Sequence, residues 1–75
     1  NPVVKIPFEI GKQESVSLTV FDLNGKKVES LIQNRMMQAG RYQIEWDAGQ
    51  YASGMYLYSI EAGEFRQTKK MVLLK

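Results

Sequence analysis

The sequence predicts an all-β protein, built as a small antiparallel β-sandwich of six to seven strands. Apolar residues recur along most of the chain with a period of two, the period of a strand with one buried face. The candidate strands follow one another at roughly ten-residue spacing and are separated by turn residues. Because no segment has the length and period of a helix, these observations favour a sandwich over any α/β fold.

The size and composition fit one small domain without obvious chemistry. The chain has 75 residues and a net charge of +2, and it contains no Cys and no His. A chain this short buries only roughly 60% of its unfolded surface, so we expect a thin core and no roomy internal active site. The absence of Cys and His removes thiol nucleophiles, imidazole bases, disulfides and the usual zinc sites. We therefore expect one domain over residues 1–75, no enzymatic activity and no cofactor.

Charge and hydrophobicity narrow the range of partners. The basic residues are scattered, so we expect no nucleic-acid partner. The longest apolar run, residues 71–74, is far shorter than the roughly 20 residues of a membrane-spanning helix, so no transmembrane segment is expected. Since the chain starts at Asn1 without Met or an export signal, we interpret it as an excised piece of a longer secreted protein.

The predicted strands cover residues 3–10, 16–21, 26–32, 41–46, 55–60 and 65–74. Pro7 lacks a ladder donor, which places the first strand at a sheet edge. Asp22-Leu23-Asn24-Gly25 predicts the turn of a hairpin, because Asn and Gly tolerate positive φ. That hairpin directs Val28 inward. A second hairpin, turning at residues 61–64, closes the domain.

The middle of the chain supplies the largest core residue and two connections. Tyr42, Ile44 and Trp46 alternate with polar residues, and we expect Trp46 to be the largest member of the core. Residues 33–38 show no clear period, and we interpret them as a loop. Residues 47–54 are rich in turn formers and predict either a connection between the two sheets or a wide turn.

Candidate catalytic and ligand-binding groups are few. A general acid and base pair needs two carboxylates across a cleft, whereas the five glutamates fall on predicted outward faces or turns, where they are solvated: Glu9, Glu29, Glu45, Glu61 and Glu64. Exposed aromatic rings on a sandwich can bind sugars, but Tyr42, Trp46, Tyr56 and Tyr58 fall among predicted core residues. Tyr51, in a loop, is the freest aromatic side chain.

The C-terminal segment is apolar on both faces of its predicted strand, which leaves two interpretations open. In one, the strand is covered on its second face, by its own sheet edge or by a dimer partner. In the other, it is an exposed edge that is captured by strand addition or by a groove in a receptor. Because the edge is apolar, we also state as a hypothesis that two copies of the chain dimerise through this strand.

Four segments, taken in order, carry a resemblance to a known family. They are VFDLNGKKV (20–28), AGRYQIEWD (39–47), ASGMYLY (52–58) and KMVLLK (70–75), and Asn1-Pro2 at the start also fits. Together they resemble the type A C-terminal sorting domain of the type IX (Por) secretion system. The resemblance covers nearly the whole chain.

The resemblance implies an Ig-like β-sandwich that acts as a secretion signal and not as an enzyme. Such domains direct an attached N-terminal cargo protein through the periplasm and across the outer membrane, to the cell surface or the extracellular space. Outer-membrane components of the system recognise the domain, and a sortase-like enzyme commonly removes it. The residues that match the terminal motif, and that we expect to be recognised, are Lys70, Met71, Val72, Leu74 and Lys75. Gly54 and Tyr56 also match family motifs, with a role that is recognition or structure.

Two other functions stay open at this point. The short 47–53 loop and the absence of Pro from residues 33–38 leave room for the related Ig-like domain of flagellar hook-capping proteins. An accessory or spacer module of an extracellular protein, binding carbohydrate or protein, is the other alternative. The carbohydrate hypothesis predicts sugar-dependent changes at Tyr51 or Trp46, whereas the sorting hypothesis predicts dependence on residues 71–75.

Overall fold

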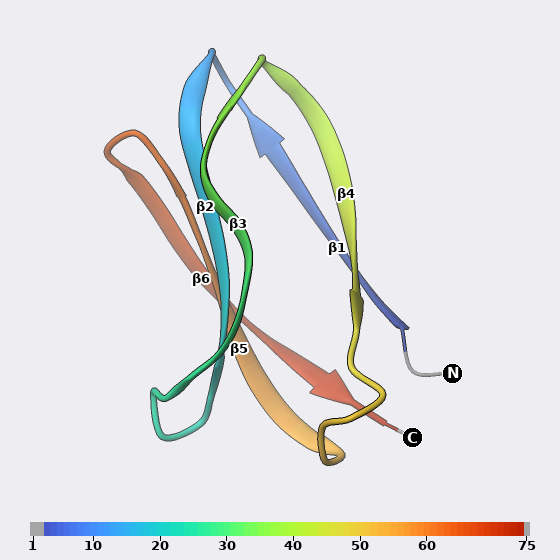
Figure 1. Ribbon diagram of the computed structural model, residues 1–75. Helices are drawn as coiled ribbons and strands as arrows, with labels where there is room; N and C mark the ends of the chain where they lie inside the picture. Colours follow the sequence, from blue (N-terminus) through green and yellow to red (C-terminus); the bar gives the residue numbers. More distant parts are fainter. Residues whose placement is uncertain (1–2, 75) are drawn as a thin grey trace.

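The computed structural model describes residues 3–74, which form six strands and no helix (Figure 1). The strands are β1 (Val3–Ile10), β2 (Glu14–Asp22), β3 (Lys27–Met37), β4 (Gly40–Asp47), β5 (Gly54–Ala62) and β6 (Phe65–Leu73). The prediction of a small all-β Ig-like sandwich is confirmed.

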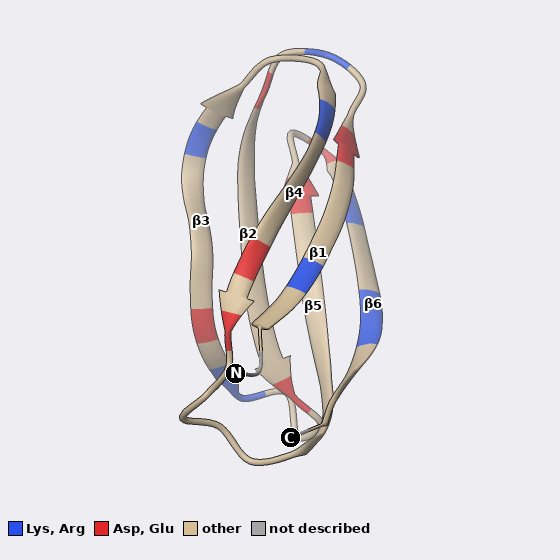
Figure 2. Cartoon of the chain, turned by 90° about the vertical axis from the view of Figure 1, so that its right-hand side faces the viewer, with Lys and Arg blue, Asp and Glu red and all other residues tan. Residues whose placement is uncertain are grey.

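The strands form two antiparallel sheets that lie face to face (Figure 1). One sheet has two strands in the order β1-β4, and the other has four in the order β3-β2-β5-β6. The connection from β4 to β5 passes from the first sheet to the second, which is one of the two alternatives that the turn formers in residues 47–54 left open. Because one sheet is narrower than the other, the strand β6 lies at an open side of the sandwich (Figure 2).

The core lies between the two sheets and consists of alternate, inward-facing residues of all six strands. Val16, Leu18 and Val20 of β2 are fully buried, and Trp46 of β4 is the largest buried side chain, as predicted. Ile6 and Ile10 supply the contribution of β1, and Val28 packs against the core from β3. No polar or charged side chain between residues 3 and 74 is buried. Apolar burial therefore holds the two sheets together.

The β2–β3 turn has the chemistry that its sequence predicts. Gly25 adopts a φ of 83°. The Asp22 carboxylate accepts hydrogen bonds from the backbone N–H groups of Asn24 and Lys26, both at 2.9 Å. The short Asp side chain thus fixes the turn, and Gly25 supplies the left-handed conformation that most residues avoid.

The prediction of a loop at residues 33–38 is wrong, because β3 continues to Met37. Bulges interrupt its pairing with β2 near Leu18 and again after Val20. Asn34 has a φ of 46°, and its backbone N–H donates to the Ser17 hydroxyl at 3.0 Å. A bulge shifts the side-chain alternation by one residue, so the strand has no constant period to detect.

Candidate recognition surface

The strand β6 directs alternate residues of the sequence motif to opposite faces of the four-stranded sheet. Leu73 points inward and is 2% exposed, and Met71 is half-buried against the core. Lys70 and Val72 lie on the outer face, where Val72 is 56% exposed. Leu74, just beyond the strand, is 80% exposed. Lys75 lies outside the described residues.

The outer face of the sheet brings other apolar side chains beside these two residues. Phe21 of β2 pairs with Leu57 of β5, and Leu57 pairs with Lys70 of β6. In the next outward-facing row, Met55 pairs with Val72. We call Phe21, Met55, Leu57 and Val72 the outer patch. The two-stranded sheet packs on the opposite face (Figure 1). Within the outer patch, Met55 and Val72 are exposed, whereas Phe21 and Leu57 are half-buried.

Basic residues frame the outer patch. Lys27 of β3 pairs with Phe21, and Lys70 closes the same row at β6, so the row reads Lys27, Phe21, Leu57, Lys70 across four strands. Both lysines are exposed. An apolar strip with a cation at each end suits a partner that presents apolar side chains beside carboxylates.

Gly54 and Tyr56 both support the loop that leads into β5. Gly54 has a φ of 152° and pairs with Leu73, although a Cβ on Gly54 would meet no atom within 4 Å. Backbone conformation, rather than space, therefore favours glycine there. Tyr56 is 8% exposed, and its hydroxyl donates to the carbonyl of Ala52 at 2.7 Å. The structure gives both residues contacts within the fold.

The prediction that Glu29 is solvated on an outward face is wrong. Its carboxylate accepts a hydrogen bond from Trp46 Nε1 at 3.0 Å and one from the Tyr51 hydroxyl at 3.2 Å. Glu29 lies next to a bulge of β3, which turns its side chain toward the space between the sheets. The carboxylate thereby supplies the acceptor that a buried indole N–H requires.

The expectation that Tyr51 is the freest aromatic residue is also wrong. Its ring is half-buried and packs on Trp46, with 5.4 Å between ring centroids. Burial, and after it the hydrogen bond to Glu29 and the charge of that carboxylate, raises the pKa of the Tyr51 hydroxyl. Trp46 is only 1% exposed, so these two rings form no sugar-stacking platform. They close the end of the sandwich together with Glu29.

The part of the chain that the structure describes provides neither a metal-ligand cluster nor a membrane-spanning helix. Between residues 3 and 74, no three side chains of His, Cys, Asp or Glu gather as they would around a metal ion. The same part of the chain has no helix long and apolar enough to cross a membrane. The surface that carries the sequence motif is thus an open sheet face and a strand edge.

Comparison with known proteins gives one match. The family described as the secretion system C-terminal sorting domain matches residues 1–74. The chain belongs to this family. The sorting domain therefore carries the C-terminal signal for type IX secretion, which implies export to the cell surface or the extracellular space. Searches of the curated proteins and of the solved structures found no match.

The structure adds to the sorting domain residues that the sequence motif alone did not suggest. Phe21, Met55 and Leu57 come from two other strands, and only the pairing of β2, β5 and β6 brings them beside Val72. One signal for them exists in the sequence. The segment 55–60 is apolar on both faces, which indicates a second covered or interacting face.

Proposed function

We propose that this sorting domain is a non-catalytic secretion signal, and that outer-membrane components of the type IX system bind it at the end of β6. The attached cargo protein would cross the periplasm, pass the outer membrane with the domain, and lose it to a sortase-like enzyme. Family membership supports the sorting role. The arrangement of β6 supports the end of this strand as the binding site.

The observation that carries the proposal is that some residues at the end of β6 pack on the core while others face solvent. Leu73 and Met71 attach the strand to the core, whereas Lys70, Val72 and Leu74 face solvent. Exposed apolar side chains that gather on one surface of a small domain are typical of an interaction site. We infer that Lys70, Val72 and Leu74 contact the machinery and that Met71 positions them, and we propose Lys75 from the sequence motif as a further recognised residue.

The first prediction concerns delivery of a fluorescent reporter fused to the N-terminus of residues 1–75 in cells with a working type IX system. We expect the single substitutions Val72→Asp and Lys70→Glu to abolish surface delivery, because each places a negative charge where the outer patch meets its partner. The measurement is reporter fluorescence at the surface against fluorescence retained in the periplasm.

A matched control separates recognition from folding. Leu23→Asp changes an exposed apolar residue of the β2–β3 turn, 59% exposed and outside the outer patch, and should leave delivery unchanged. Simple deletion of residues 70–75 is a poor test, because it also removes Leu73 from the core. Delivery of the Val72→Asp and Lys70→Glu fusions at the normal level would contradict recognition at β6.

A further inference from the structure

Four strands have one unpaired edge each: β1, β3, β4 and β6. They differ in the features that hinder the addition of another strand at that edge. β1 carries Pro7 in its middle, and β3 is interrupted by bulges. Both features hinder the addition of another strand. β4 carries charges of both signs, at Arg41 and Glu45. β6 has neither Pro, Gly nor a bulge, and it pairs with β5 without a register shift from Phe65 to Leu73.

The hairpin geometry decides which backbone groups of β6 face the free edge. Gly63 and Glu64 alone form the turn, and Gly63 has a φ of 61°, which fits a two-residue turn with Gly in first place. Such a turn is closed by Ala62 and Phe65, and hydrogen-bonded pairs alternate from there. The N–H groups of Arg66, Thr68 and Lys70 therefore point away from β5.

All charged side chains of β6 are basic. The strand carries Arg66, Lys69 and Lys70 and no acidic residue (Figure 2). The Arg66 guanidinium forms an ion pair with Glu61 of β5, so the lysines hold the free positive charge of the strand. Lysines on an edge oppose pairing with neutral or basic strands, but they attract an acidic one.

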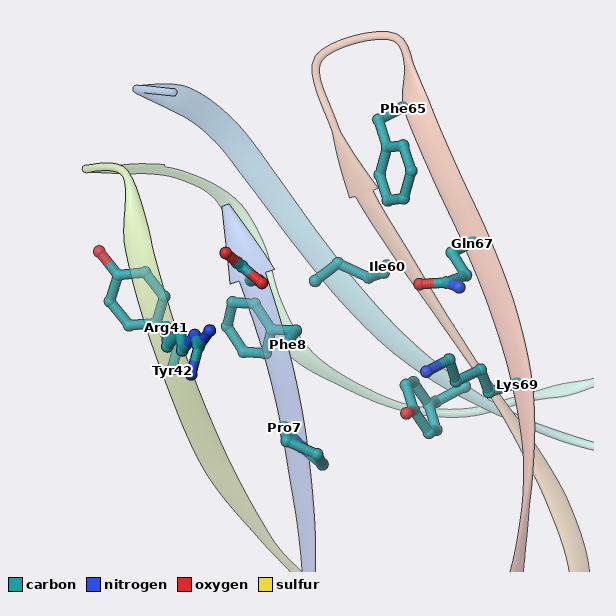
Figure 3. A pocket seen from close by; sticks show the side chains of 10 residues that line it. Pro7, Phe8, Arg41, Tyr42, Ile60, Phe65, Gln67 and Lys69 are labelled. Atoms are coloured by element: carbon teal, nitrogen blue, oxygen red, sulfur yellow. The ribbon is translucent and has the colours of Figure 1, made fainter. Parts of the chain in front are cut away.

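A groove with apolar and charged lining residues lies beside the same strand. Its volume is about 460 Å³, and it runs between β1 and the inner face of β6 (Figure 3). Phe8, Ile60 and Phe65 form its apolar part. Glu9, Arg41 and Lys69 supply its charged groups, of which two are cations and one is an anion. Phe65 is 56% exposed because the two-stranded sheet does not reach over it. A strand placed next to β6 would direct alternate side chains to this groove.

We propose that β6 accepts an extended acidic segment of a partner protein as a fifth strand of the larger sheet. Apolar side chains of the segment cover Phe65 at the mouth of the groove, and its carboxylates lie beside Lys70 on the outer face. This inference deepens the proposed function, since the segment would belong to the machinery that reads β6.

A second copy of this chain is the poorer occupant. Two β6 strands paired antiparallel about their centre would place Lys69 directly opposite Lys69. Like charges directly opposite one another destabilise a strand pair. The basic character of β6 thus favours a different, acidic partner over self-association.

The test uses the 75-residue chain and a short blocked peptide in which Val and Glu alternate, with hydrogen exchange of the amides followed by NMR. We expect the peptide to slow exchange at Arg66, Thr68 and Lys70. A peptide with Lys in place of Glu should bind at least about tenfold more weakly. Amides of Gln67 and Lys69, already directed to β5, should not change.

Two substitutions locate the site. Thr68→Pro removes an edge donor and should abolish binding, whereas Thr68→Ala keeps the N–H and should bind normally. Lys69→Glu with Lys70→Glu should reverse the preference to the basic peptide. The control, Lys26→Glu with Arg35→Glu, changes the net charge equally at exposed sites outside β6 and should retain the acidic preference.

The outcomes distinguish this inference from the sorting function. Absence of protection at the edge amides, or peptide-induced dimerisation through β6, would overturn strand addition, while reporter delivery would still report on sorting. Binding of the acidic peptide by a domain that delivers no reporter would leave strand addition standing and overturn the proposed function.

Discussion

Glu29, Trp46 and Tyr51 show how a single carboxylate closes one end of this sandwich. The indole N–H of Trp46 and the Tyr51 hydroxyl both donate to Glu29, and the Tyr51 hydroxyl also reaches the carbonyl of Val28 at 3.5 Å. The two rings contact each other, and Tyr56 meets Trp46 edge-on at 5.6 Å. The 48–53 connection is therefore attached to β3 by polar contacts as well as by apolar ones.

The raised pKa of Tyr51 predicts a pH dependence of stability. A tyrosine whose pKa is higher in the folded protein favours the neutral hydroxyl, so its stabilisation is complete below the unfolded pKa of about 10 and is lost as pH rises above that value. At pH 7, Tyr51→Phe should lower the free energy of unfolding by about 1 kcal/mol, the contribution of a typical hydrogen bond. The difference between the two proteins should shrink above pH 10.

Urea unfolding between neutral pH and pH 11 measures this difference. Burial also raises the pKa of Tyr58, so both proteins should lose some stability in alkali. The comparison isolates Tyr51 because only one of the two proteins has that hydroxyl. A gap between the proteins that stays constant with pH would refute the role assigned to the Tyr51 hydroxyl.

At the scale of elements, the turns and bulges decide what each strand can do. Gly25 turns β2 into β3, and the bulges of β3 protect its edge. β6 has a two-residue turn and an unbroken register, which leaves its edge regular. The strand that carries the family motif is thus the one in which local geometry permits both an ordered outer face and an ordered edge.

Gly11 and Gly25 allow the effect of backbone conformation to be distinguished from the effect of available space. A Cβ at Gly25 or at Gly11 would meet no atom within 4 Å, but only Gly25 has a left-handed φ. Gly25→Ala should therefore destabilise the domain by about 1–2 kcal/mol. Gly11→Ala should be neutral or stabilise it by up to about 1 kcal/mol, because it restricts the unfolded chain. Thermal unfolding measures both, and equal effects would contradict the account.

The sequence predicted those elements whose alternation is unbroken. In β1, β2 and β4 each strand pairs regularly with a neighbour, so apolar residues mark the inner face throughout. For β3 the sequence predicts a strand only to Ile32, because bulges change which side of the strand faces the core. The same irregularity hid Glu29. Alternation alone does not place Phe21 and Leu57 on one surface, because their proximity depends on pairing between distant segments.

At the scale of the molecule, the two sheets differ in how far apart their strands lie along the chain. β2 and β3 are joined by one short turn, and so are β5 and β6. β1 and β4 pair across the whole of the β2–β3 hairpin, with Val3 opposite Asp47. The narrow sheet therefore depends on non-local contacts alone, whereas the wide sheet combines two local hairpins with the non-local β2–β5 pairing.

The order of assembly during folding follows from this pairing. Closing a long loop costs conformational entropy before its contacts are made, so the two hairpins should form before the β1–β4 and β2–β5 pairings. Pulse-labelled hydrogen exchange should accordingly show β5 and β6 amides protected before those of β1 and β4; the reverse order would refute this sequence of events. A chain that emerges unfolded from an export channel would thus display β6 while its narrow sheet is still open.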